Sequence, residues 1–119
     1  MKAEQQTTTL PEVILLFDAR GARPENAAGV GGFWYEPEVW ALPLSPTSKV
    51  LYTSLCSFLG HGQINRRDLR GALENRTDEE IARNLEELVR HKLLVPADRV
   101  TNSDTVADYE VRSIGEFEG

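Results

Sequence analysis

The sequence predicts a small α+β domain in which three helices are followed by a β-hairpin. Three observations lead to this expectation. Apolar side chains recur at helical spacing in three consecutive segments between residues 46 and 92. Each segment begins beside a residue suited to cap a helix. Two stretches that fit β-strands then follow, at residues 93–96 and 107–114, with a polar loop between them.

The composition limits the classes of protein to which this chain can belong. With 119 residues, the chain is long enough for one domain with a modest core. Its hydrophobic content of 40% and charged content of 27% argue against disorder. The longest apolar run, Val13–Phe17, is too short to span a membrane, and the polar N-terminus does not fit a signal peptide. The lone cysteine, Cys56, fits a reducing compartment, so we expect a cytoplasmic protein.

The first predicted helix covers residues 46–60. Ser45 can cap it, and Pro46 suits the first helical position, where no amide hydrogen is needed. Its apolar face consists of Leu51, Leu55, Phe58 and Leu59. Gly60 is expected to end the helix in the left-handed conformation, and Gln63-Ile64 then leaves room for a very short strand.

The second predicted helix covers residues 66–74. Asn65 and Asp68 have the spacing of a capping box. The helix is followed by the tight connection Glu74-Asn75-Arg76, in which Asn75 tolerates a left-handed backbone. Two helices joined by such a short turn have the geometry of a helix-turn-helix.

The third predicted helix covers residues 78–92. Thr77 and Glu80 form a second capping box, and the buried face is expected to consist of Ile81, Leu85, Leu88 and Val89. The order of helix, short strand, helix, tight turn, helix and hairpin is that of a winged helix-turn-helix. The sequence therefore predicts a three-helix core with a C-terminal β-hairpin wing.

Parts of the sequence resemble a known family. Leu44-Ser45-Pro46, followed by Lys49, Tyr52 and Leu55, resembles the start of the winged-helix domains of bacterial and phage replication initiators, of the DnaD-like or plasmid-initiator-like kind. The later stretch IARNLEELVRHKLL resembles the end of these domains, with Lys92 where they often carry glycine. The resemblance covers residues 33–114 and implies a DNA-binding role in replication initiation or transcriptional regulation.

The expected organisation has three parts: an N-terminal extension at residues 1–32, the winged-helix domain at residues 33–114 and a flexible tail at residues 115–119. The apolar run in the extension fits a strand or a helix, packed on the first helix or against a second copy of the chain. Because extensions of DnaD-like domains serve in dimerisation, the resemblance favours a homodimer contact through Val13, Leu15 and Phe17.

The charge distribution bears on DNA binding. A net charge of −6 is unfavourable for binding phosphates, but residues 61–100 carry eight basic and eight acidic side chains and hold most of the arginines. We expect any DNA contact to be made with the phosphate backbone, by Arg66, Arg67, Arg70, Arg76, Arg83 and Arg99. The alternative is that these are ordinary surface arginines paired with neighbouring carboxylates.

Three carboxylates open the third helix: Asp78, Glu79 and Glu80. The favoured interpretation is that they cap the helix and complement its dipole. The alternatives are an acidic docking face for a basic protein partner and direct contact with bases, which carboxylates rarely make. The runner-up function is accordingly a winged-helix protein-interaction or oligomerisation module without DNA contact.

The remaining conspicuous residues give little support for catalysis. Phe33-Trp34-Tyr35 and Trp40 fit a strand and short helix that close the core, or else a base-stacking or partner-binding patch. Asp18 ends an apolar run without a visible partner, and no metal-binding or nucleotide-binding spacing occurs. We expect a non-enzymatic protein without cofactor, metal or small-molecule ligand.

Overall fold

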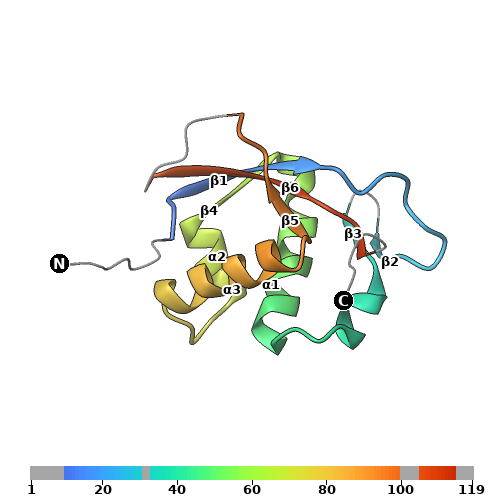
Figure 1. The fold of residues 1–119 in the computed structure, drawn as a ribbon, viewed down its shortest axis with the longest axis horizontal. Coiled ribbons are helices and arrows are strands. Elements are labelled where there is room, and N and C mark those ends of the chain that lie inside the picture. Colours follow the sequence, from blue (N-terminus) through green and yellow to red (C-terminus); the bar gives the residue numbers. More distant parts are fainter. Residues whose placement is uncertain (1–9, 31–32, 100–104, 115–119) are drawn as a thin grey trace.

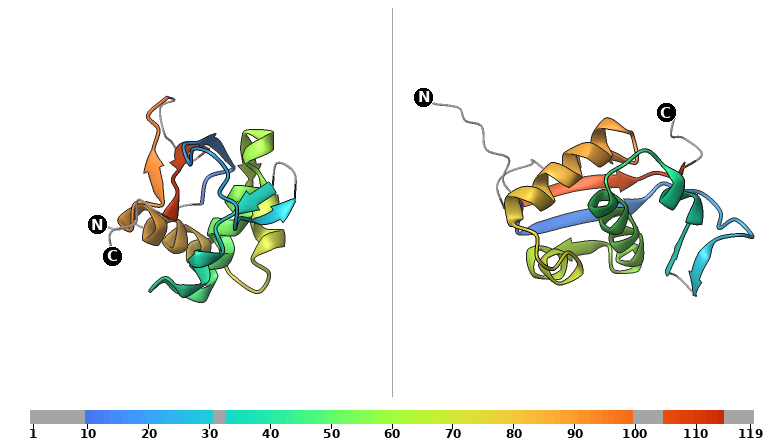
Figure 2. Two further views of the ribbon diagram at one scale, coloured as in Figure 1. Left: turned by 90° about the vertical axis from the view of Figure 1, so that its right-hand side faces the viewer. Right: turned by 90° about the horizontal axis from the view of Figure 1, so that it is seen from below.

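A four-stranded sheet is covered on one face by three α-helices (Figure 1). The structure, a computed structural model, describes residues 10–30, 33–99 and 105–114, so the predicted tail at residues 115–119 and the first nine residues of the predicted extension lie outside it. The helices lie across the same side of the sheet, and α1 contacts both α2 and α3 (Figure 2). The chain is a compact α+β fold with a mixed sheet.

The three predicted helices are confirmed as α1 (Pro46–Ser57), α2 (Arg66–Ala72) and α3 (Asp78–Arg90). Ser45 caps α1 by accepting a hydrogen bond from the amide of Ser48. Both predicted capping boxes are present at the starts of α2 and α3. Both capping boxes could be predicted because a capping box depends only on two residues that lie three positions apart.

The helix ends were predicted with mixed success. Asn75, between α2 and α3, is left-handed as expected, with φ 70°. Lys92 has φ 66°, so it adopts the left-handed conformation that glycine takes most readily. The prediction for Gly60 was wrong. The α-helix ends at Ser57, a 3-10 turn η3 (Leu59–His61) follows, and Gly62, with φ 75°, takes the left-handed position.

The predicted hairpin consists of β5 (Leu94–Pro96) and β6 (Val106–Val111), which pair antiparallel. Residues 100–104 of its loop lie outside the described part. Asp108 is a polar residue in the alternating pattern of this strand, yet it is fully buried. Its carboxylate accepts a hydrogen bond of 2.7 Å from the backbone amide of Arg99, at the start of the loop.

The apolar run near the N-terminus forms β1 (Val13–Asp18), an inner strand of the sheet. It pairs in parallel with β6, from Val13 opposite Val106 to Asp18 opposite Val111. On its other side it pairs antiparallel with β4 (Gln63–Asn65), giving the order β4-β1-β6-β5. Residues 13–18 of the predicted extension therefore belong to the same sheet as the hairpin.

A second, smaller sheet lies beyond α1 at one end of the molecule (Figures 1 and 2). It consists of β2 (Ala28–Val30) and β3 (Phe33–Tyr35), followed by the 3-10 helix η2 (Pro37–Ala41). The expected strand and short helix around the aromatic residues are confirmed. β2 was not predicted, since a three-residue strand leaves no periodic pattern to detect.

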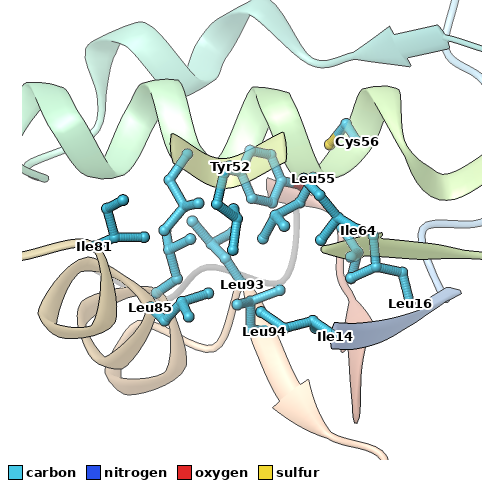
Figure 3. Close-up of a cluster of buried hydrophobic side chains, with 14 of the residues drawn as sticks. Ile14, Leu16, Tyr52, Leu55, Cys56, Ile64, Ile81, Leu85, Leu93 and Leu94 are labelled. Carbon is cyan, nitrogen blue, oxygen red and sulfur yellow. The ribbon is translucent and has the colours of Figure 1, made fainter. Parts of the chain in front are cut away.

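The core lies between the sheet and the helices (Figure 3). Ile14 and Leu16 of β1 point into it and are buried, an effect worth about 1.5–3 kcal/mol for each side chain. They meet residues from all three helices and the neighbouring strands, among them Leu51, Tyr52, Leu55, Ile64, Leu69, Ile81, Leu85, Leu88, Leu93 and Leu94. The alternation of β1 places Val13, Leu15 and Phe17 on the opposite face, away from the helices.

Candidate functional site

The surface at the start of α3 holds the three carboxylates singled out in the sequence. Glu80 belongs to the capping box: it accepts the Thr77 amide hydrogen at 2.8 Å, and its own amide donates to the Thr77 hydroxyl at 3.1 Å. The hydrogen bond from the Thr77 backbone lowers the pKa of Glu80. The Glu80 carboxylate is therefore bound within the N-terminal cap of α3.

The other two carboxylates each face an arginine. Asp78 accepts two hydrogen bonds from Arg70 of α2, at 2.8 and 2.5 Å, and these bonds lower the pKa of Asp78. Glu79 lies 3.5 Å from Arg83, one turn further along α3. Both pairs are largely exposed to solvent. The first turn of α3 is thus acidic in sequence but has its charges matched by neighbouring groups.

The remaining predicted arginines have different surroundings. Arg66 donates to the backbone oxygen of Leu10 at 2.6 Å, which ties the segment before β1 to α2. Arg76 donates through Nε to the hydroxyl of Thr47 at 3.2 Å. Arg67 is exposed on α2. These three side chains remain on the helical side of the molecule.

Arg99 is separated from the other five arginines. Its guanidinium carbon lies 4.1 Å from the centre of the Phe17 ring. Phe17 belongs to the sheet face that points away from the helices, so Arg99 lies on that face too. The six predicted arginines therefore do not form one continuous basic surface.

The predicted contact residues of β1 form a row on this open face of the sheet. Val13, Leu15 and Phe17 are each half-buried. Their partners across the strand pair are Val106, Asp108 and Glu110. The row is apolar along β1, and Arg99 covers the Phe17 end of it. Beside it, Asp108 is buried, so Glu110 is the acidic residue that remains partly exposed.

A contact that the sequence did not indicate joins α3 to the start of α1. The carboxylate of Glu87 accepts hydrogen bonds from the Ser45 amide at 3.2 Å, from the Ser45 hydroxyl at 2.9 Å and from the buried Ser48 hydroxyl. Burial by itself would raise the pKa of Glu87, but the bonds from Ser48 and Ser45 outweigh it and lower the pKa.

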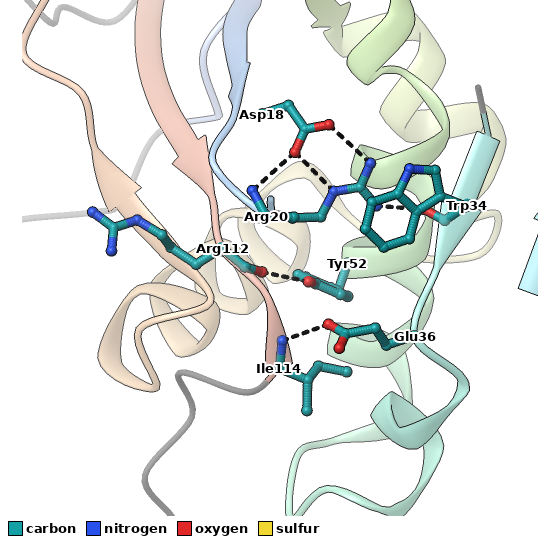
Figure 4. Close-up of polar contacts among 7 residues, drawn as sticks. All are labelled: Asp18, Arg20, Trp34, Glu36, Tyr52, Arg112 and Ile114. Atoms are coloured by element: carbon teal, nitrogen blue, oxygen red, sulfur yellow. Dashed lines mark hydrogen bonds and ion pairs between the residues drawn. The ribbon is translucent and has the colours of Figure 1, made fainter. Parts of the chain in front are cut away.

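A second missed contact surrounds Asp18, at the end of β1 (Figure 4). Arg20 binds both carboxylate oxygens of Asp18, at 3.0 and 3.1 Å, and donates to the backbone oxygen of Trp34. Its guanidinium carbon lies 3.7 Å from the centre of a Trp34 ring, and its side chain is only 1% exposed. Asp18 therefore has an ion-pair partner two residues away, which the sequence analysis did not detect.

Two further contacts attach the end of β6 to the helical layer (Figure 4). Tyr52 of α1 donates to the Arg112 backbone oxygen at 2.5 Å, and the Ile114 amide donates to Glu36 at 2.7 Å.

The cysteine of the chain, Cys56, lies close to Tyr52 in α1. Burial raises the pKa of the Cys56 thiol to about 12. That thiol is therefore protonated and unreactive at neutral pH.

The aromatic group divides between core and surface. Trp34 is buried, whereas Phe33 and Trp40 are 46% and 47% exposed. Tyr35 packs edge-on against Trp40, with ring centres 6.3 Å apart. Trp34 therefore closes the core as expected, whereas the side chains of Phe33 and Trp40 lie at the surface.

The described residues offer neither a metal site nor a membrane-spanning helix. In residues 10–30, 33–99 and 105–114, no three His, Cys, Asp or Glu side chains are grouped so that they could hold a metal ion. Within the same ranges, no helix has the length and apolarity required to cross a membrane. Comparison of the chain with family models, with curated proteins and with solved structures finds no match.

Proposed function

We propose that this chain is a winged-helix domain that acts by binding a protein partner, without catalysis. The winged-helix assignment is supported by the order α1, β4, α2, α3, β5, β6 and by the short connection between α2 and α3. The insertion of β1 between β4 and β6 is an addition to that order. A winged helix serves both DNA and protein partners, so the choice between them depends on the surface.

The preference for a protein partner over DNA rests on the pairing of charges at the start of α3. A helix that reads bases presents Arg, Lys, Asn or Gln to the groove. Here the first turn presents carboxylates, and Arg70 and Arg83 face Asp78 and Glu79. Arginines engaged in this way are poorly suited to neutralise phosphates, and the net charge of −6 adds a general repulsion.

DNA binding is the second candidate, and one observation favours it. Arg67 of α2 and Arg90 of α3 are exposed, and neither has a carboxylate partner in the described part of the chain. Two such side chains could make weak contacts with phosphates. Binding of this kind would depend little on sequence and steeply on salt.

Titration of fluorescent duplex and single-stranded DNA with the full chain distinguishes the candidates. At about 200 mM salt we expect no saturation with micromolar protein, and at about 50 mM salt only weak binding that is independent of sequence. In parallel, purification of the tagged chain from its own cells should yield a defined protein complex that remains after nuclease treatment. Tight, sequence-specific duplex binding would contradict the proposal.

A further inference from the structure

A pocket of about 250 Å³ lies between the smaller sheet and α1. The wall that belongs to the smaller sheet consists of Gly29, Phe33, Trp34 and Tyr35. The wall that belongs to α1 consists of Thr53, Ser54 and Ser57. Among the described residues, no Asp, Glu, Lys, Arg or His lines this pocket. The pocket therefore suits an uncharged ligand, since neither an anion nor a cation would find an opposite charge in it.

The three hydroxyls of α1 can only accept hydrogen bonds from a ligand. Thr53 and Ser54 both donate to the backbone oxygen of Val50, at 2.9 and 2.8 Å. Ser57 donates to the backbone oxygen of Ser54 at 2.8 Å. Each hydroxyl has thus used its one hydrogen, and no described residue donates a hydrogen bond to its oxygen. A ligand that binds this wall must bring hydrogen-bond donors.

The opposite wall supplies one donor and one open ring. Trp34 is only 8% exposed, yet its indole N–H remains accessible and has no hydrogen-bond partner among the described residues. Arg20 occupies a face of the Trp34 ring (Figure 4), whereas the ring of Phe33 is 46% exposed. The ligand should therefore also carry an acceptor, and a flat apolar face that can lie on Phe33.

The spacing of the acceptors separates the classes of uncharged ligand. Thr53 and Ser57 are one helical turn apart, so a ligand that reaches both needs donors separated by about 5–6 Å. A nucleobase carries its donors along one edge, whereas the hydroxyls of a sugar ring surround it. Each sugar hydroxyl both donates and accepts, which also suits the N–H of Trp34. One face of such a ring exposes C–H groups and is apolar.

We propose that this pocket binds a neutral sugar ring, with its apolar face on Phe33 and its hydroxyls donating to the oxygens of α1. The volume fits one ring, because sites for larger ligands enclose about 300–1,000 Å³. This inference goes beyond the binding of a protein partner. It also departs from the expectation, drawn from the sequence, of a protein without a small-molecule ligand.

Tryptophan fluorescence can report the binding. The chain has two tryptophans, so Trp40→Phe, at an exposed position, leaves Trp34 as the single one. The probes are glucose, galactose, mannose and N-acetylglucosamine, each compared with its methyl glycoside. We expect a saturable change in emission in the millimolar range with at least one of them, as is usual for so small a ligand. A site for a linked sugar accepts the glycoside as well, whereas a site for a free sugar rejects it.

Variants of the two walls locate the binding. Ser54→Ala and Ser57→Ala remove acceptors at positions where alanine is the better helix former, so a loss of binding cannot be attributed to unfolding. We expect each to weaken sugar binding about three- to tenfold. Thr47→Ala is the matched control, because it removes a hydroxyl of the same helix that does not line the pocket. Phe33→Ala should also weaken binding, and Phe33→Tyr, which keeps the ring, should preserve it.

The outcomes separate this inference from the proposed function. Sugar binding that falls in Ser57→Ala and Phe33→Ala but not in Thr47→Ala would support it. Binding confined to adenosine, cytidine or lysine amide, used as competing probes, would overturn the assignment to a sugar. The absence of a response to any sugar up to about 50 mM would overturn it as well. Neither negative result affects the complex with a protein partner, which is tested by purification and not by sugar binding.

Discussion

The carboxylate of Glu87 in α3 accepts a hydrogen bond from the hydroxyl of the buried Ser48, in the first turn of α1. The same carboxylate binds the amide and hydroxyl of Ser45. A side chain of α3 therefore completes the cap of α1 and joins the two helices at that end.

Replacement of Glu87 by Gln should reduce stability in a pH-dependent way. At neutral pH we expect the free energy of unfolding to fall by about 1–2 kcal/mol, because bonds to a charged acceptor are lost. The lowered pKa of Glu87 means that its contribution is complete above the ordinary glutamate value. It is lost as pH falls through the lowered folded value, so wild type and variant should converge in acid. Chemical denaturation at neutral and acidic pH measures this, with Glu25→Gln, an exposed change, as the control.

Replacement of Arg20 by Lys should be strongly destabilising. Lysine cannot at the same time bind both carboxylate oxygens of Asp18, stack on the Trp34 ring and donate to the Trp34 backbone oxygen. We expect a loss of about 2–4 kcal/mol in denaturation, with a red shift in tryptophan emission as Trp34 meets water. Arg23→Lys removes an exposed bond to the Gly29 backbone and should change little. Equal effects of the two changes would contradict the role assigned to Arg20.

Replacement of Lys92 by Gly should stabilise the chain by about 1 kcal/mol, because lysine is held there with φ 66°. Lys92→Ala retains the strained conformation and should give no gain. Thermal and chemical denaturation of both variants provide the measurement. A loss of stability in Lys92→Gly would mean that the lysine side chain contributes more than its backbone conformation costs.

Replacement of Asp78, Glu79 and Glu80 by Asn, Gln and Gln should increase DNA binding at low salt. The change removes the partners of Arg70 and Arg83, and it removes three negative charges from the surface. It should also lower stability, because the negative charges that complement the helix dipole are removed, although Gln at position 80 can still accept the Thr77 amide hydrogen. The matched control replaces Glu12, Glu25 and Glu38 by Gln, which alters the net charge equally elsewhere. An equal increase in the control would show that net charge alone governs DNA binding.

The local features of this fold could be predicted from sequence. The caps at Ser45, Asn65 and Thr77 depend on residues within one helical turn, and so does the left-handed turn at Asn75. Gly60 was misjudged because a second glycine, Gly62, lies only two positions further on and could equally take the left-handed position. In the structure the 3-10 turn Leu59–His61 includes Gly60 and leaves the left-handed position to Gly62.

The contacts that define the surface could not be predicted in the same way. Glu87 meets Ser45 from 42 positions away, and Arg20 reaches Trp34 across 14. The pairing of Arg70 with Asp78 crosses the turn between two helices. Residue types at these positions allow many partners, and only the packing of the helices selects one. The place of β1 within the sheet was open for the same reason, since apolar strands fit several neighbours.

The pairing of β1 with β6 has a consequence for the order of events during synthesis. Val13 leaves the ribosome early, but its parallel neighbour Val106 is made only after all three helices. Until then β1 has β4 as its single neighbour, and the edge that β6 will occupy is an open template for other chains. Nascent chains halted before residue 106 should therefore be recognised by chaperones, and release should follow the emergence of β6.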